Sequence, residues 1–408
     1  VRPNPGGGSW LTVSGEGRGS AQQGLQYLQA TPVTQGIGQY LSTWQAQGET
    51  DFSLALNIPL FIQGARPQID LALGFENNSV YMPEFDLNVT DLGGGLHYSA
   101  AEGLQSNNMS GTLLGEAVTI DVRADGMEQT PEGARVLVQG DVAMEALGTW
   151  SGMPELVSQT EGSAAYTAEL RLPVYGSAGV SNGLLHPRLT ISSELEGVGI
   201  NYPAPFGKTV EDSRGLLLEL DFVPLSLALS LSLQDIMQMN LSLRDNTVYN
   251  GLVYFGSPGQ GLRVRRLDES APGVSVLGNL PELDFDDWSD VVGRLRSSTE
   301  GSSGLDLGFD VTAEIGIGRL LAFDEVFETL SIQLVQEDDI WILGVNGEDI
   351  AGTVRSPEMA DGPWSVELEH LHLSRSVTGQ TQEEIEAARE DVAFADLPDV
   401  EAGVELDL

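Results

Sequence analysis

Apolar and polar residues alternate along the chain between Asp51 and Asp125, in one short run after another. The clearest of these runs are Phe52–Ile62, Ile69–Phe75, Phe85–Val89 and Val118–Val122. A period of two places the apolar side chains of a strand on one face and the polar ones on the other. This region therefore predicts successive strands that share one apolar and one polar face.

Short groups of glycine, asparagine and glutamine separate these runs, and such residues favour turns. The groups are Gln63–Gly64, Asn77–Asn78, Gly93–Gly95 and Asn107–Asn108. Strands joined by turns this short pair in the antiparallel sense. We therefore expect an antiparallel meander whose apolar face needs a covering or a ligand.

The most regular alternation lies further on, in Leu216–Phe222 and Leu225–Leu233, where leucine alternates mainly with serine and alanine. A well-specified core usually combines side chains of different shapes, and this face is nearly all leucine. Two interpretations remain open at this point. The face either contacts a fluid aliphatic ligand or forms an ordinary sheet core under other elements.

Other elements are expected around these strands. Helices are predicted at Ser20–Leu28, Thr34–Gln47, Asp284–Ser298 and Thr381–Glu390. Additional strands are predicted at Trp10–Gly15, Leu305–Val311, Leu330–Val335, Ile340–Leu343 and Val366–Leu373, and Gly126–Gly162 looks less regular. The fold class expected is mainly β: a long, antiparallel, twisted sheet curved into an open hydrophobic groove, with a few short helices.

Two similar pairs of segments suggest an internal repeat. Leu170–Tyr175 is similar to Leu56–Phe61, and Gly199–Pro203 is similar to Ser79–Pro83, in the same order. Repeats that share a sheet stack along one direction. The expected domains are an N-terminal strand with capping helices (1–50), three groove units (51–165, 166–280 and 281–375) and an acidic helix and tail (376–408).

Composition narrows the function. The chain has 408 residues and a net charge of −41, which repels nucleic acid phosphates. The simpler interpretation of this charge is that it keeps the protein in solution. Cysteine is absent, so disulfides and thiolate metal sites are excluded. No apolar run approaches the ~20 residues of a membrane-spanning helix.

The sequence shows no nucleophile elbow, no P-loop and no metalloprotease helix. His370 and His372 lie two residues apart on a predicted strand and could begin a metal site, but the sequence places no third ligand. We therefore expect no enzymatic activity, no catalytic residue, no cofactor and no metal.

Several motifs resemble the YhdP family within the AsmA-like group. The most specific is Tyr202–Lys208, which resembles a Pro-Ala-Pro-Phe-Gly-Lys segment of that family. Thr31–Leu60, Leu96–Tyr98, Glu102–Leu104, Leu113–Gly115, Trp341, Gly352–Val354, Pro357 and Asp396–Asp399 add further similarity. The resemblance covers nearly the whole chain, which is more acidic than expected for the family.

The resemblance implies a periplasmic segment of an intermembrane lipid-transport bridge, which conducts phospholipid acyl chains along a β-groove. It also implies an inner-membrane anchor outside this chain, and inner and outer membranes or envelope proteins as partners at the two ends. Phospholipid is the expected ligand, and nucleic acid is not. The alternative is a structural or interaction β-solenoid of the cell envelope with a closed apolar core.

The candidate lipid-binding residues are the apolar members of the alternating runs. They are Leu54, Leu56, Ile58, Leu71, Leu73, Leu87, Leu218, Leu220, Leu227, Leu229, Leu231 and Leu307.

Overall fold

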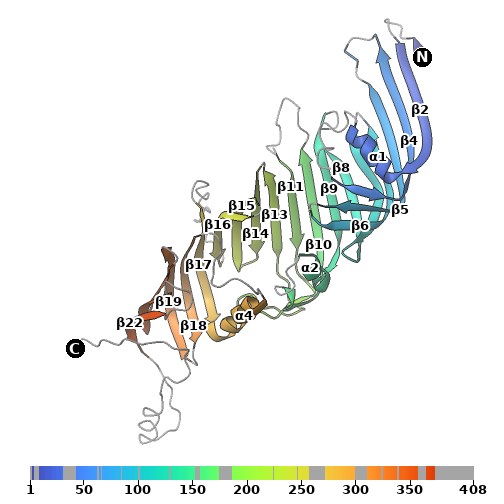
Figure 1. Ribbon diagram of the computed structural model, residues 1–408. Helices are drawn as coiled ribbons and strands as arrows, with labels where there is room; N and C mark the ends of the chain where they lie inside the picture. The colour runs from blue at the N-terminus through green and yellow to red at the C-terminus, as the bar shows by residue number, and fades with distance from the viewer. Residues whose placement is uncertain are drawn as a thin grey trace, which may run out of the picture. The chain divides into compact units, whose positions relative to one another are not determined.

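The computed structural model shows a chain that is mainly β-strand (Figure 1). It describes residues 2–3, 9–30, 43–61, 64–65, 67–83, 85–99, 102–127, 130–151, 157–173, 186–223, 225–245, 247–256, 272–298, 310–322, 325–337, 340–356 and 364–372. Two compact units divide the chain. The first unit is Val1–Ile200 with Lys208–Leu233, and the second is Asn201–Gly207 with Gln234–Leu408.

The first unit is an antiparallel sheet, in which most strands pair with the next strand along the chain. Its strands are β1 (Arg2–Pro3), β2 (Ser9–Ser20), β3 (Gln45–Gln47), β4 (Glu49–Leu60), β5 (Gln68–Met82), β6 (Leu87–Ser99), β7 (Gly103–Leu113), β8 (Glu116–Met127), β9 (Thr130–Ala143), β10 (Thr160–Pro173), β11 (Arg188–Ser193), β12 (Val198–Ile200), β13 (Leu216–Val223) and β14 (Ser226–Leu233). β2 pairs with β4, both β3 and β4 pair with β5, and β11 pairs with β13. β12 pairs with the start of β10.

The second unit is a mixed sheet. Its strands are β15 (Met237–Arg244), β16 (Thr247–Phe255), β17 (Gly273–Asp284), β18 (Val311–Ala322), β19 (Glu325–Glu337), β20 (Ile340–Asn346), β21 (Ile350–Arg355) and β22 (Ser365–Leu371). β16–β17 and β17–β18 are parallel, whereas the other neighbouring pairs are antiparallel. The expected mainly β class is confirmed, and these two parallel pairs are the departure from the expected antiparallel order.

Three helices occur in the part of the chain that the structure describes. They are α1 (Ala21–Ala30), α2 (Met144–Ser151) and α4 (Phe285–Ser298). α1 and α4 confirm two predicted helices, whereas α2 was not predicted. Gln45–Gln47, the end of the predicted helix Thr34–Gln47, forms strand β3 instead because it pairs with Ser79–Tyr81. Residues 31–42 and the helix predicted at Thr381–Glu390 lie outside the described residues.

Three predicted turns are β-bulges within long strands. The pairs Asn77–Asn78 and Asn107–Asn108 lie inside β5 and β7, and Gly93–Gly95 lies inside β6. The register of each strand shifts at these positions. Gly94 has φ of 100°, and a Cβ there would lie 2.4 Å from the carbonyl oxygen of Asn108. The predictions failed because a bulge needs the same positive φ angles and small residues as a turn.

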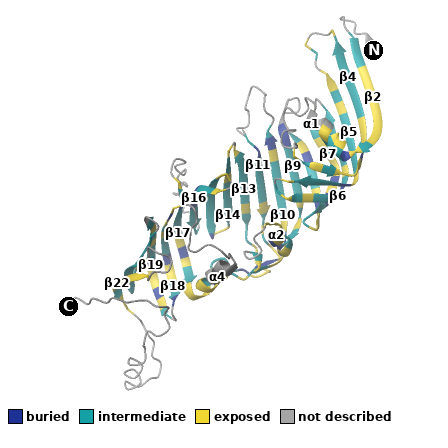
Figure 2. Ribbon diagram, viewed as in Figure 1, coloured by how far each residue is buried: buried dark blue, intermediate teal, exposed yellow. Residues whose placement is uncertain are grey.

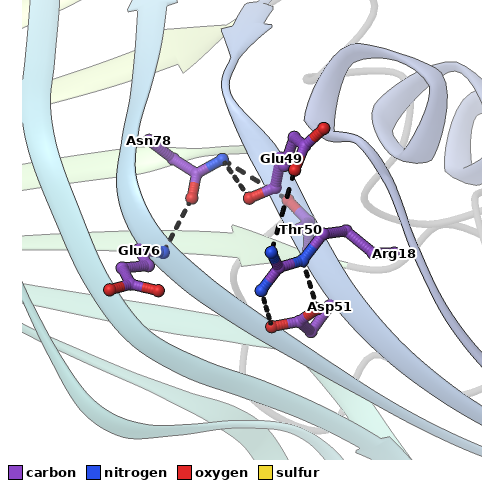
Figure 3. A network of polar contacts seen from close by, with 6 residues as sticks. All are labelled: Arg18, Glu49, Thr50, Asp51, Glu76 and Asn78. Carbon is purple, nitrogen blue, oxygen red and sulfur yellow. Dashed lines mark hydrogen bonds and ion pairs between the residues drawn. The ribbon is translucent and has the colours of Figure 1, made fainter.

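A buried asparagine holds the bulge of β5 against the neighbouring strands (Figure 3). The side-chain amide of Asn78 donates to the carbonyl oxygens of Gln47 at 3.2 Å and Glu49 at 3.1 Å. Its oxygen accepts from the Glu76 N–H at 2.9 Å. Asn78 is 1% exposed, so these bonds satisfy groups that water does not reach.

An ion pair on β2 and β4 lies beside this asparagine (Figure 3). The Arg18 guanidinium donates to both carboxylate oxygens of Asp51, at 2.7 and 3.0 Å. This bidentate hydrogen bonding holds the pKa of Asp51 below its ordinary value. The pair is exposed, so its main effect is to fix the register of the two strands.

Candidate functional site

Leucine side chains of β13 and β14 lie opposite one another on one face of the first unit. Leu218 pairs with Leu231, and Leu220 pairs with Leu229. Residues directly opposite in paired strands point to the same side of the sheet. These four predicted site residues therefore form one apolar patch, which Leu227 extends opposite Phe222.

The strand register extends this patch into rows that cross neighbouring strands. One row, from β14 to β8, consists of Leu229, Leu220, Leu189, Leu170, Val136 and Val122. The next row, from β14 to β7, consists of Leu231, Leu218, Ile191, Ala168, Val138, Ile120 and Met109. The apolar face is therefore continuous over these strands; we call it the apolar face of the first unit.

The candidate residues nearer the N-terminus lie on β4, β5 and β6. Leu54 pairs with Leu71, and Leu73 pairs with Leu96. Leu56 lies opposite Ile69, and Ile58 lies opposite Leu11. Leu87 lies at the start of β6, opposite Met82. The structure thus brings the candidates together as two groups in one sheet, whereas Leu307 lies outside the described residues.

Burial along this face is graded (Figure 2). Leu218, Leu220 and Leu229 are half-buried, as are the other described candidates. In contrast, Leu92, Met109 and Val122 form a buried cluster, with partly buried Phe75, Val80, Val89, Leu96, Leu104, Ile120 and Val136 against it. The face is therefore a closed core around β6–β8 and is partly accessible on β13 and β14.

The principal helix contacts of the first unit lie elsewhere. α1 packs against β2, β3 and β4, and α2 packs against β9 and β10. Among the described residues, the main element contacts of β13 and β14 are with each other and with β11. A face with this accessibility exposes aliphatic surface that favours contact with an apolar ligand.

The second unit has a corresponding face. One row crosses all its strands from β15 to β22 and consists of Met239, Val253, Val276, Ala313, Leu334, Leu343, Val354 and Val366. A buried cluster of Ile317, Ala322, Phe327 and Leu330 lies beside it. This row could not be recognised from the sequence, because its residues are spread over eight strands and only the register connects them.

The opposite face of the first unit is polar and carries ion pairs. The Arg188 guanidinium donates to Asp221 at 2.6 and 2.9 Å, and this raises the pKa of Arg188 above its ordinary value. Arg171 and Arg135 both lie beside Glu169, at 2.5 and 3.7 Å. These residues alternate with the apolar rows, so one face of the sheet is polar and the other is apolar.

A hollow of 820 Å³ lies at the N-terminal part of the first unit. Its lining consists of Glu16, Gly17, Asp51, Phe52, Ser53, Ala72, Leu73, Gly74, Gly94, Gly95, Asn107 and Asn108. Leu73 is the predicted site residue among them. Apolar and polar groups both line this hollow.

Two side chains bond to backbone carbonyls at the Tyr202–Lys208 segment: Lys208 itself and Trp288 of α4. In the first unit, the Lys208 ammonium donates to the carbonyl oxygens of Leu195 and Thr209, each at 2.9 Å, and to that of Val198. Burial lowers the pKa of this ammonium. In the second unit, the Trp288 indole N–H donates to the Ala204 carbonyl at 2.9 Å.

The histidine pair does not assemble a metal site in the described part of the chain. His370 and His372 have ring centroids 5.5 Å apart, and His370 Nε2 lies 3.2 Å from the Gly347 oxygen. Among the residues described, no group of three or more His, Cys, Asp or Glu side chains could hold a metal ion. No helix in the same residues is long and apolar enough to cross a membrane.

These features define a class: a mainly β protein in which each unit carries apolar rows that cross neighbouring strands, partly accessible on β13 and β14 of the first unit. The chain belongs to the YhdP protein family, whose model matches residues 4–405. It is similar to the "Intermembrane phospholipid transporter YhdP" of Escherichia coli (strain K12), with 22% identity over 217 residues. That match covers 52% of this chain and 16% of the relative. No solved structure matches the chain.

Proposed function

We propose that this chain is a periplasmic segment of a lipid-transport protein, in which phospholipid acyl chains lie along the apolar face. The observation that carries the proposal is the continuous row from Leu229 to Val122, which is half-buried on β13 and β14. The family and the name of the Escherichia coli relative support it. Binding requires no chemistry at a reactive group, so the proposed role is not enzymatic.

The energetics favour an aliphatic ligand on this face. Each buried methylene of an acyl chain contributes about 0.8 kcal/mol, so even a partly seated chain gains several kcal/mol. The repeated leucines offer similar contacts at successive positions along a row. A bound chain can therefore move between neighbouring positions without losing its contacts, while its polar headgroup stays in water.

The proposal includes the wider arrangement implied by the family. We place an inner-membrane anchor outside this chain, with inner and outer membranes or envelope proteins at the two ends of the full-length protein. Residues 51–165, 166–280 and 281–375 are the proposed successive groove units. The predicted structural equivalence of Pro59 and Pro173, at the ends of β4 and β10, belongs to this proposal.

The test uses a photoreactive amino acid at two adjacent positions of β14 in the full-length protein. At position 229 the probe points to the apolar face, and at position 230 it points to the opposite face. We expect captured phospholipid at position 229 and little at position 230. Equal capture, or none at position 229 in a folded protein, would favour a structural β-solenoid with a closed core.

A further inference from the structure

Two aromatic rings, one from a turn and one from a strand far away in the sheet, meet over the apolar face of the first unit. Phe85, in the turn between β5 and β6, packs edge-on against Phe222 of β13, with ring centroids 5.9 Å apart and an interplanar angle of 77°. Phe222 alternates with Leu218 and Leu220, so its ring lies on the apolar face. Phe85 therefore approaches β13 from that side of the sheet.

The strand order shows how far this contact reaches. β7, β8, β9, β10 and β11 lie between β6 and β13 in the sheet. Six steps between neighbouring strands would span roughly 29 Å in a flat sheet. The two rings can touch only if the curled sheet brings the β5–β6 turn over the apolar face of the intervening strands.

A hydrogen bond fixes the same turn to helix α2. The Trp150 indole N–H donates to the Phe85 carbonyl oxygen at 2.9 Å. Within the turn, the Tyr81 hydroxyl donates to Asp86 at 2.9 Å, and the Phe85 N–H donates to the Met82 carbonyl at 3.2 Å. Phe85 and Asp86 are thus bonded to the end of β5, and Phe85 also contacts Phe222 and Trp150. We call these three side chains, Phe85, Trp150 and Phe222, the aromatic strap.

The attachments of the strap are suited to release. Trp150 is 38% exposed, and Phe85 and Phe222 are half-buried, so solvent already reaches the strap. Among the described residues, the ring contact with Phe222 of β13 and the hydrogen bond from Trp150 of α2 connect the turn to elements other than β5 and β6. By comparison, the β5 and β6 strands beneath the turn share a long ladder of backbone bonds, so the turn can move while its strands stay paired.

We propose that the aromatic strap is a gate across the apolar face of the first unit, which opens for an acyl chain to pass between β13 and β6. The inference rests on the proposed lipid transport and adds where passage is controlled. In the closed state, the contact between Phe85 and Phe222 holds the strap over the face. When the ring contact opens, the strap no longer covers the path along the apolar face between the leucines of β13 and β14 and the apolar residues of β4–β6.

The absence of cysteine makes a direct test practical. Phe85→Cys and Phe222→Cys are introduced together into the full-length protein, with any cysteine outside this chain replaced. A short bismaleimide then joins the two positions and holds the strap closed. A matched pair, Thr190→Cys with Glu219→Cys, joins opposed residues on the polar face, which should not obstruct the groove.

The readout is transfer of a fluorescent phospholipid from donor to acceptor vesicles by the purified protein. We expect the bridged Phe85–Phe222 pair to slow transfer severalfold relative to its unbridged form, because the joined turn cannot move off the apolar face. Each bridged variant is compared with its own unbridged form. The Thr190–Glu219 pair should keep its rate when it is bridged, whereas the unbridged Phe85→Cys/Phe222→Cys protein, which lacks both rings, should transfer at least as fast as the unsubstituted protein. Undiminished transfer with the strap bridged would overturn the gate.

Capture by a photoreactive residue at position 229 separates this result from a failure of the proposed function. If the gate exists, capture persists in the bridged protein while transfer is slow. Loss of capture in the unbridged protein would overturn both proposals.

A second variant, Trp150→Phe, keeps the ring but removes its N–H donor. It should speed hydrogen exchange at the β5–β6 turn, with β9 and β10 unchanged; unaltered exchange at the turn would also count against the gate.

Discussion

The chain has 19 lysine and arginine residues, and Lys208 is the only lysine among them. Its ammonium is surrounded by three backbone carbonyl oxygens at a position that is 9% exposed. A compact ammonium has three donors that can meet three such acceptors, whereas the planar guanidinium of arginine is larger and has a fixed fork. The site therefore selects lysine by shape as well as by charge.

Lys208→Arg should consequently lower the free energy of unfolding by about 1–3 kcal/mol, because carbonyls would lose their donor in a confined space. Urea unfolding measures the effect. Arg355→Lys, at an exposed position beside Glu367, is the matched control and should change stability by less than about 0.5 kcal/mol. Equal effects of the two substitutions would show that Lys208 acts only as a surface charge.

Leu229→Asp tests the apolar face at the same scale. A carboxylate among aliphatic side chains is costly where an acyl chain excludes water, so lipid transfer should fall strongly. Folding should suffer less than for a buried leucine, because Leu229 is only half-buried. Ser230→Asp, on the opposite face, should leave transfer near normal. If Leu229→Asp unfolds the protein in a thermal melt, the face is ordinary core.

The β-bulges decide the course of β5, β6 and β7. Alternation in the sequence was sufficient to predict the first half of β5 and the start of β6, because side-chain period follows directly from strand geometry, but β7 was not predicted. It was not sufficient to predict their length, since Asn77–Asn78 and Gly93–Gly95 carry the residues of a turn but lie inside strands. What distinguishes the two outcomes is the tertiary partner of Asn78, which the sequence does not reveal.

The candidate site shows the same division. The leucines of β13 and β14 were identified because their alternation is local. Leu189 and Ile191 were not, because their short strand carries little signal until its register with Leu220 and Leu218 is known. The parallel pairs of β17 also escaped prediction, since connections that cross a sheet are not encoded in strand periodicity.

Asn78→Ala should lower the free energy of unfolding by about 2–3 kcal/mol, because it leaves buried carbonyl and amide groups of the bulge without partners. Chemical denaturation provides the measurement. Asn88→Ala, at an exposed position of β6, should cost far less. The bulge account would be wrong if hydrogen exchange in β3 and β5 stayed unchanged in the Asn78 variant.

Charge acts over the whole molecule. A net charge of −41 means that repulsion among carboxylates outweighs the few exposed ion pairs, such as Arg18–Asp51. Salt shortens the Debye length from about 30 Å at 0.01 M to about 3 Å at 1 M, so it weakens repulsion across the whole surface. Stability should therefore increase with salt.

The corresponding experiment is a thermal melt in rising sodium chloride at constant pH. We expect Tm to increase between low and moderate salt and then to level off as screening becomes complete. A charge-balanced variant with surface glutamates replaced by glutamine should show a smaller increase. A Tm that falls with added salt would mean that the ion pairs contribute more to stability than the repulsion removes.

The buried ammonium of Lys208 also determines how this chain can be studied chemically. Amine-reactive cross-linkers and labels depend on accessible lysine, and this chain has one, whose nitrogen is occupied by three carbonyls. A survey of neighbours by amine cross-linking would therefore miss contacts made by these residues. Reagents that activate carboxylates have 60 aspartate and glutamate side chains to use, and they are the suitable chemistry for mapping its neighbours.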